Sequence, residues 1–292
     1  MVVARTLKQS VRWISREFPE LQTTIYTVDD DNSALRIPKN KGNEAMVYIS
    51  YIIDNYDMLP DIVIFAHAHP RAWHSDKILG HSTSTTIKRL NGAHVVRQGY
   101  VNLRCQWDPG CPGRTLSTQP KDSDDIEMII YRQAWNEIRP ESPVPKVIGQ
   151  PCGGQFAASR SRIRATPQSQ WEFYRTWLMT TNLTDHRAGR VWEYMWQVVL
   201  TGQAEWCPEQ ASCYCESFGV CFGSWGRFQG WEALEDQQKL LMDQLLREEG
   251  SSTKSSSLRE EIDAVGLQMK QILTSAIQAG DRYVESLPVV HA

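Results

Sequence analysis

Strand-like and helix-like stretches alternate through the first 70 residues, and this alternation restricts the fold more than any other feature of the chain. Short β-branched or apolar runs alternate with segments whose apolar residues recur at helical spacing. The expected elements are a strand at 2–4, a helix at 8–18, a strand at 23–28, a loop and then a helix within 40–60, and a strand at 61–66. Strand–helix repeats predict an α/β fold with a mostly parallel central sheet flanked by helices.

The C-terminal part has a different character. Helices are expected at 126–138, 171–178 and 189–200, whereas acidic residues are in excess beyond about residue 230. We therefore predict a catalytic α/β domain at 1–230 and a helical extension at 231–292, with a flexible Ser-rich linker at 250–257. Leu258, Ile262 and Val265 begin a stripe spaced by four and three residues, which is typical of an amphipathic helix. Such helices dock on the body or on a second copy, so oligomerisation through them is one expectation.

Composition narrows the class of protein. There are 31 Lys and Arg against 34 Asp and Glu, a net charge of −3, which excludes a uniformly basic chain. No apolar stretch approaches the ~20 residues of a membrane helix, and the N-terminus carries no apolar signal segment, so we expect a cytoplasmic protein without membrane contact. The seven cysteines are then expected to be thiols. Four of them, Cys207, Cys213, Cys215 and Cys221, lie close enough to suggest zinc, although buried thiols fit their spacing better.

Two groups of polar residues follow predicted strands and should meet at one edge of the sheet. Asp29 and Asp30 follow the second strand, and His67, His69 and His74 follow the third. A strand end suits a histidine that acts as a general base, holds a metal, or has a structural role, and all three readings stay open. The carboxylates would hold a metal or a guanidinium, or form an ordinary turn.

Basic residues recur along several segments despite the negative total charge. Arg12 and Arg16 lie on one face of the first predicted helix, Lys88 and Arg89 belong to an acid-free stretch, and Arg160 and Arg162 alternate after FAAS. Such patches bind nucleic-acid phosphates or are simply solvated. The sequence motifs for ATP, dinucleotide, zinc-protease or serine-hydrolase chemistry are missing, so an enzyme of this kind would use a substrate that is already activated.

Five ordered segments together resemble a fungal family of arginine-containing cyclodipeptide synthases, formerly described only as a domain of unknown function. They are residues 40–74, GYVNLRCQWDPGCP at 99–112, CGGQFAASRSRI at 152–163, GRVWEYMW at 189–196 and CYCESFGVC at 213–221. The resemblance implies an enzyme of secondary metabolism that joins arginine to a second amino acid and closes a diketopiperazine. Its implied partners are arginyl-tRNA and a second aminoacyl-tRNA, and no cofactor is needed because the aminoacyl ester is activated. NKGNEA and QFAASR also resemble segments of sugar-nucleotide transferases, which implies a glycosyltransferase-A-like fold.

Motif position and chemistry assign the site residues. The reaction needs a base, donors for an oxyanion and a carboxylate for the guanidinium. Catalytic roles fall to His67, His69 and Glu193, substrate contacts to Asp29, Asp30, Asn40, Glu44, His74 and Gln155, and tRNA contacts to Arg12, Arg16, Lys88, Arg89, Arg160 and Arg162. Ser159 or Cys152 would carry a covalent aminoacyl group, should one form. The rival interpretations are a metal-dependent glycosyltransferase-like enzyme that uses a nucleotide sugar, and a binding module without catalysis.

Overall fold

The computed structural model describes residues 1–116, 123–248 and 252–286. It divides into two compact units, Met1–Pro208 and Glu209–His291. The division lies earlier than residue 230, because the helix that follows Pro208 belongs to the second unit. Each unit is described separately.

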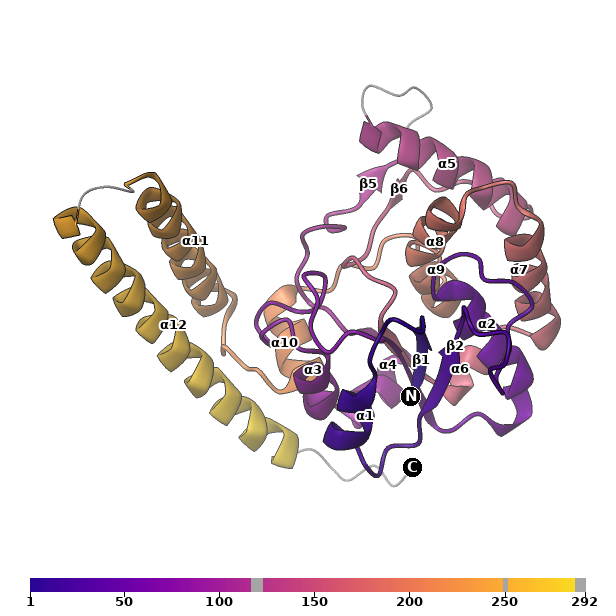
Figure 1. Ribbon diagram of the computed structural model, residues 1–292, viewed down its shortest axis with the longest axis horizontal. Coiled ribbons are helices and arrows are strands. Elements are labelled where there is room, and N and C mark those ends of the chain that lie inside the picture. The colour runs from indigo at the N-terminus through magenta and orange to yellow at the C-terminus, as the bar shows by residue number, and fades with distance from the viewer. Residues whose placement is uncertain (117–122, 249–251, 287–292) are drawn as a thin grey trace. The chain divides into compact units, whose positions relative to one another are not determined.

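A five-stranded sheet forms the centre of the first unit (Figure 1). Its order is β2 (Thr24–Thr27), β1 (Val2–Arg5), β3 (Ile62–His67), β7 (Phe156–Ser159) and β4 (Tyr100–Asn102). The strand β1 pairs in parallel with β2 and β3, whereas β7 runs antiparallel to both β3 and β4. The predicted α/β class with a mostly parallel sheet is therefore confirmed.

The sheet is covered by helices on both faces, and side-chain alternation along the strands explains why. Val2 and Phe65 contribute to one hydrophobic core, while their neighbours Val3 and Ala66 contribute to another on the opposite face. The larger core involves α2 (Ala45–Asp54), α5 (Ser123–Ile138), α7 (Gln168–Thr180), α8 (Asp185–Glu193) and α9 (Trp196–Thr201). The smaller core involves α1 (Arg12–Glu17) and α3 (Thr83–Arg89). A parallel sheet buried on both faces follows from this arrangement.

The remaining elements of the first unit are short. They are η1 (Tyr56–Met58), α4 (Gly92–Gln98), α6 (Arg160–Arg164), and the paired strands β5 (Arg114–Thr115) and β6 (Val147–Ile148). Two expectations need correction. The first helix is shorter than predicted, and the single helix expected at 189–200 is two helices, because α8 ends at Glu193 and α9 begins at Trp196.

The second unit is helical, as expected for the C-terminal part. It contains α10 (Gln210–Phe218), α11 (Trp225–Arg247) and α12 (Ser252–Ser286). The helices α11 and α12 lie side by side and bury Leu241, Ile262 and Val265 between them (Figure 1). The apolar stripe read from the sequence thus packs helix against helix. The expected linker at 250–257 is wrong over 252–257, which belong to α12, and residues 250–251 lie outside the described residues.

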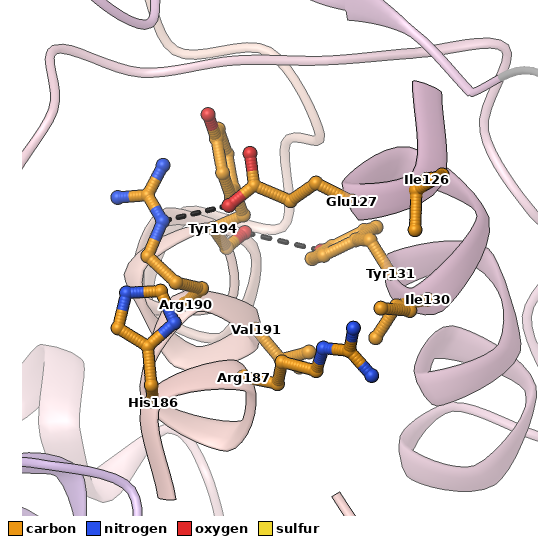
Figure 2. A pocket seen from close by; sticks show the side chains of 9 residues that line it. All are labelled: Ile126, Glu127, Ile130, Tyr131, His186, Arg187, Arg190, Val191 and Tyr194. Carbon is orange, nitrogen blue, oxygen red and sulfur yellow. Dashed lines mark hydrogen bonds and ion pairs between the residues drawn. The ribbon is translucent and has the colours of Figure 1, made fainter. Parts of the chain in front are cut away.

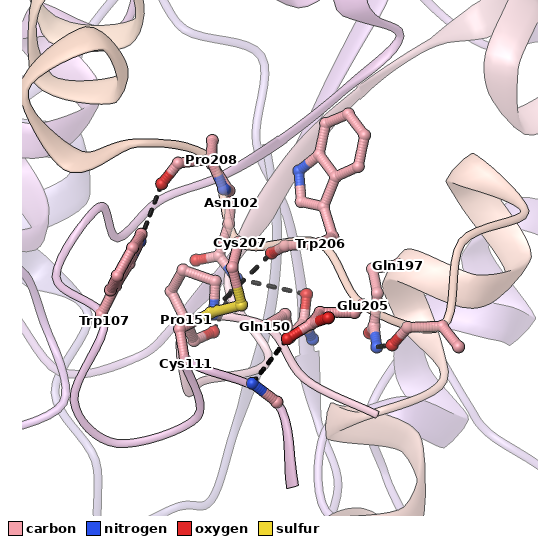
Figure 3. The surroundings of a disulfide bond; sticks show 12 residues. Asn102, Trp107, Cys111, Gln150, Pro151, Gln197, Glu205, Trp206, Cys207 and Pro208 are labelled. Atoms are coloured by element: carbon pink, nitrogen blue, oxygen red, sulfur yellow. Dashed lines mark hydrogen bonds between the residues drawn. A yellow bond between two sulfur atoms is a disulfide. The ribbon is translucent and has the colours of Figure 1, made fainter. Parts of the chain in front are cut away.

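The expectation that the cysteines are thiols is wrong. Cys111 pairs with Cys207 in the first unit and Cys215 with Cys221 in the second, while Cys105 and Cys213 are disulfide-bonded too. Only Cys152 is free. Figure 3 shows that the Cys111–Cys207 bond is accompanied by two hydrogen bonds, from Trp107 Nε1 to the Pro208 carbonyl (2.7 Å) and from the Gly113 N–H to Glu205 Oε1 (2.7 Å). Disulfides persist in oxidising compartments, so this pairing does not support the cytoplasmic prediction from which the thiols were inferred.

Candidate active site

A cavity of about 350 Å³ lies where the carboxyl ends of the three parallel strands meet. Parallel sheets commonly bind ligands at this edge. The strand ends contribute Arg5, Val28, His67 and His69, and the segment before α2 contributes Asn40, Asn43 and Glu44, with Gln9, His74 and Asp185 completing the wall. The cavity therefore gathers a histidine cluster and carboxylates that are far apart in the sequence.

His67 is the best-connected residue of this cavity. Its backbone N–H donates to Gln155 Oε1 (3.0 Å), its Nδ1 lies 2.8 Å from His74 Nε2, and its Nε2 lies 3.7 Å from Glu44 Oε1. Burial alone would lower the pKa of His67, but the carboxylates of Glu44 and Glu193 outweigh it, so the pKa lies above its ordinary value of 6.5. Gln155 thus contacts the backbone of His67, whereas Glu44 and His74 contact its ring.

The two imidazoles have complementary protonation. Burial, followed by the charge of His67, lowers the pKa of His74 to about 4, so His74 is neutral near pH 7. When His67 is protonated, its Nδ1–H can donate to Nε2 of the neutral His74. The other ring nitrogen, Nε2 of His67, faces the Glu44 carboxylate at 3.7 Å and makes no hydrogen bond in the described structure.

Backbone geometry places Glu44 beside His67. Glu44 stands at the N-cap position of α2, after the left-handed residues Gly42 (φ 74°) and Asn43 (φ 52°). The carboxylate of Asp185 accepts the N–H groups of Gly42 (2.6 Å) and Asn43 (3.2 Å) and so fixes this turn. At Gly154 a Cβ atom would lie 2.2 Å from Glu44 Oε1, so only glycine leaves room for the carboxylate.

A chain of alternating charges leads from the protein surface to Glu193. Arg114 contacts Glu127 (3.1 Å), Arg190 Nε donates to Glu127 Oε1 (2.7 Å), and Arg190 also pairs with Glu193. Arg190 and Glu127 both line a second cavity of about 270 Å³ between α5 and α8, and Figure 2 shows the hydrogen bond that joins Arg190 to Glu127. Burial raises the pKa of Glu193 to about 7, although Arg190 opposes the shift.

Cys152 lies against the inner end of this chain. Its Sγ is 3.8 Å from Glu193 Oε2 and 3.8 Å from Arg190. Burial, and then the charge of Glu193, raises the pKa of the Cys152 thiol. Ser159, the other nucleophile candidate, caps α6 by accepting the Arg162 N–H. The Cys152 thiol therefore lacks the lowered pKa of an activated nucleophile, although the Glu193 carboxylate lies beside it.

Asp29 and Asp30, which follow β2, make separate contacts with nearby backbone. Asp29 accepts the Leu7 N–H (2.7 Å) and Asp30 accepts the Asn32 N–H (3.0 Å), so both carboxylates brace local backbone. Asn40 does line the cavity, and His69 lines it too, held by Gln9 (3.0 Å). Among the residues that the structure describes, no group of three or more His, Cys, Asp or Glu side chains is placed to hold a metal ion.

The predicted tRNA contacts fall into two groups. Arg12 and Arg16 on α1 adjoin Lys88 and Arg89 on α3, and Glu17 joins these helices by pairing with Lys88 (2.6 Å) and Arg16 (3.1 Å). The other group is on α6, after β7. There Arg160 pairs with Asp61 (3.0 Å), and Arg162 donates to the carbonyl of Gln98 (3.4 Å). Much of the charge in both groups is therefore balanced within the protein.

Sequence reasoning missed Asp185 and Gln9. Asp185 begins α8 after the capping residue Thr184, a position at which an acidic residue needs no functional explanation. Nothing in its local sequence points to the turn at Gly42, 143 residues away. The helix pattern gives Gln9 no special role either, so only the tertiary structure assigns these residues to the cavity.

Comparison with known proteins places the chain in a family. A family model described as "Protein of unknown function (DUF3431)" matches residues 1–216. The chain belongs to the DUF3431 family. No curated protein and no solved structure matches it. The DUF3431 region contains every residue that lines the cavity at the strand ends, whereas α11 and α12 lie beyond it. In the described part of the chain, no helix is long and apolar enough to cross a membrane.

Proposed function

We propose that this DUF3431 protein forms arginine-containing cyclic dipeptides, cyclo(Arg-Xaa), from arginyl-tRNA and a second aminoacyl-tRNA. The observation that carries the proposal is the pairing of His67 with Glu44 inside a cavity that Asp185 also lines. One histidine and two carboxylates are the groups needed to accept an amine proton and to hold a guanidinium. The resemblance of the five ordered segments adds the reaction itself, and the separate resemblance of NKGNEA and QFAASR adds the glycosyltransferase-A-like fold, which we propose with it.

His67 is the proposed base. The α-amine of an amino acid has a pKa of about 7.7–8.0, so a base with a pKa above 6.5 is well matched to receive its proton. The base form required is the neutral tautomer of His67 that donates its Nδ1–H to His74 and offers the lone pair of Nε2 to the amine. When Nε2 takes the proton, the nearby Glu44 carboxylate stabilises the imidazolium that forms.

The reaction consists of two acyl transfers. The α-amine nitrogen of one aminoacyl group attacks the ester carbonyl carbon of the other, the C–O ester bond breaks, and the ribose oxygen leaves with the proton that His67 returns. The α-amine of the resulting dipeptidyl ester then attacks its own ester carbonyl, which closes the six-membered ring and releases the second tRNA. No external energy source is required, because each ester bond supplies its own activation.

The two carboxylates that line the cavity would bind the arginine side chain. Asp185 uses Oδ1 for the backbone of Gly42 and Asn43, and Glu44 presents Oε1 to His67. Each carboxylate retains a second oxygen that can accept from a guanidinium. Charge-assisted contacts of this kind are shorter and stronger than neutral hydrogen bonds, and the planar guanidinium matches a carboxylate better than an ammonium does.

The test is mass spectrometry of metabolites from a host that expresses the chain alone. We expect a cyclo(Arg-Xaa) ion that the empty-vector control lacks. His67→Asn should reduce it about 100-fold or more, since general acid–base catalysis contributes that much. The matched control is His186→Asn, because His186 is exposed on α8 and lines the other cavity. The proposal fails if folded protein gives no such ion, or if His67→Asn and the control behave alike.

The disulfides favour a second candidate, a transferase that uses a nucleotide sugar. Six of the seven cysteines are disulfide-bonded, and disulfides form in oxidising compartments, where charged tRNA is not expected. Mass spectrometry of the intact, non-reduced protein from its natural host measures whether these cysteines are paired in the cell. Fully paired cysteines with no cyclic dipeptide would favour the transferase, and its sugar-nucleotide binding and metal dependence would be measured next.

A further inference from the structure

Arg5 occupies a position in the cavity that the proposed base chemistry does not use. It ends β1, is half-buried, and lines the cavity. Its guanidinium donates from Nε to Thr27 Oγ1 (2.9 Å) and from NH1 to the carbonyl of Gln9 (3.2 Å). Both acceptors are neutral, and no acidic residue in the described part of the chain pairs with Arg5. The structure thus fixes an uncompensated positive charge at the carboxyl end of a central strand.

The side chain of Gln9 connects Arg5 to His69. Gln9 Oε1 accepts the Thr6 N–H (2.7 Å), so its Nε2 is the donor to His69 Nε2, 3.0 Å away. In this arrangement His69 Nε2 accepts and the proton sits on Nδ1, which remains available as a donor. Gln9 therefore positions two groups at once, the guanidinium through its backbone carbonyl and the imidazole through its side chain.

The cavity consequently holds groups of opposite character. Arg5 and His69, from the ends of β1 and β3, offer donors, while Glu44 and Asp185 offer carboxylates. We propose that Arg5 in this cavity binds a phosphate group of the substrate. A guanidinium can donate two parallel hydrogen bonds to a phosphate, and the ends of parallel strands are a common location for such ligands.

Two kinds of substrate would present this phosphate. If the proposed function holds, it belongs to the 3′ end of an aminoacyl-tRNA, whose arginine side chain would then reach the carboxylates. If it does not, the phosphate belongs to a nucleoside diphosphate. The assignment of the phosphate to tRNA rests on the proposed function, but the binding of a phosphate by Arg5 does not.

The experiment is isothermal titration of the full chain with two probes, the trinucleotide CCA and the nucleotide UDP. Arg5→Gln should weaken the binding of the accepted probe about tenfold or more, because it removes a charge-assisted contact. It should also lower the slope of log affinity against log salt by about 1. Arg175→Gln is the matched control, since Arg175 lies on α7, pairs with Asp54 (3.9 Å) and does not line the cavity.

The outcomes separate the two proposals. Binding of CCA that depends on Arg5 supports both of them. Binding of UDP alone, with the same dependence, keeps the phosphate proposal and counts against cyclodipeptide formation. If neither probe binds, or if Arg5→Gln binds as the control does, the phosphate proposal is overturned.

A second variant covers the case in which Arg5→Gln does not fold. Arg5→Lys keeps the charge but loses the planar guanidinium that donates two parallel hydrogen bonds. It should therefore weaken the binding of the accepted probe several-fold while leaving the salt slope unchanged. An Arg5→Lys protein that binds as tightly as the unaltered chain would count against a direct contact.

Discussion

His67 contacts a carboxylate and a second imidazole. Glu44 favours the charged form of His67, whereas His74, whose own pKa is about 4, is neutral near pH 7. The carboxylate therefore makes the His67 imidazole more basic, against the effect of burial. Its protonation near neutral pH depends on Glu44.

The dependence on Glu44 gives a prediction about pH. Because the pKa of His67 lies above 6.5 and the neutral form is the base, turnover should rise with pH through that pKa and level off above it. Glu44→Gln removes the main cause that raises the pKa of His67, so the midpoint should move to lower pH. The pH profile of product formation and an NMR titration of the imidazoles both report it. A midpoint that stays where it is in Glu44→Gln would contradict this account.

The sequence predicted some of these residues because they follow strands or sit within a quoted motif. His67, His69, His74, Glu44 and Asn40 are of this kind, and all five line the cavity. Asp29 and Asp30 share the same sequence signal, yet they brace backbone instead. A carboxylate after a strand is equally suited to either task, and only the path of the following loop decides between them.

At the scale of elements, the loop between β4 and β5 is held by a covalent bond. Cys111 in this loop is joined to Cys207, 96 residues further along the chain, near the end of the first unit. The surrounding hydrogen bonds from Trp107 and Gly113 hold the same two segments together (Figure 3). Closing so long a loop removes many conformations from the unfolded chain.

Removing this bond should lower the free energy of unfolding. We expect the double variant Cys111→Ser and Cys207→Ser to lose about 2–5 kcal/mol, measured by denaturant unfolding without reductant. A reductant breaks all the disulfides of the unaltered protein, so it should lower the free energy of unfolding by at least as much as the double variant does. Equal stability of the double variant and the unaltered protein would show that the two cysteines are not joined in solution.

Most elements near the N-terminus could be predicted from the sequence, whereas the later ones could not. The alternation of β1, α1, β2, α2 and β3 is visible because apolar runs and helical spacing of apolar residues take turns along this stretch. The strands β4 and β7 are three and four residues long and pair antiparallel to one another. They do not belong to a regular strand–helix alternation that would mark them in the sequence. Their pairing is decided by long-range contacts in the buried core, which one sequence does not reveal.

At the scale of the whole molecule, each unit has its own apolar core. The first is organised around the sheet, and the second contains the seam between α11 and α12. The seam was visible as a stripe in the sequence, but the boundary at Pro208 was not, because the composition changes only later. Two antiparallel helices depend mainly on such a seam for their stability.

A charge in the seam should therefore unfold the helix pair. Ile262→Asp places a carboxylate at a position that is 9% exposed, and we expect amide protection to be lost along α11 and α12. The amides of the sheet should keep their protection, because their core lies in the first unit. Leu267→Asp is the matched control, since Leu267 on the same helix is 56% exposed. Hydrogen exchange with mass spectrometry measures the amide protection of both variants. Equal loss of protection in the two would show that the seam between α11 and α12 does not stabilise the helix pair.

The odd number of cysteines has a kinetic consequence. With six paired, Cys152 is the thiol of the described chain that can begin disulfide exchange, so without an added thiol a reshuffled state must pass through an attack by its thiolate. Burial beside Glu193 keeps that thiolate scarce, because it raises the pKa of the thiol. The contact of Cys152 with Glu193 thereby slows the scrambling of the covalent cross-links.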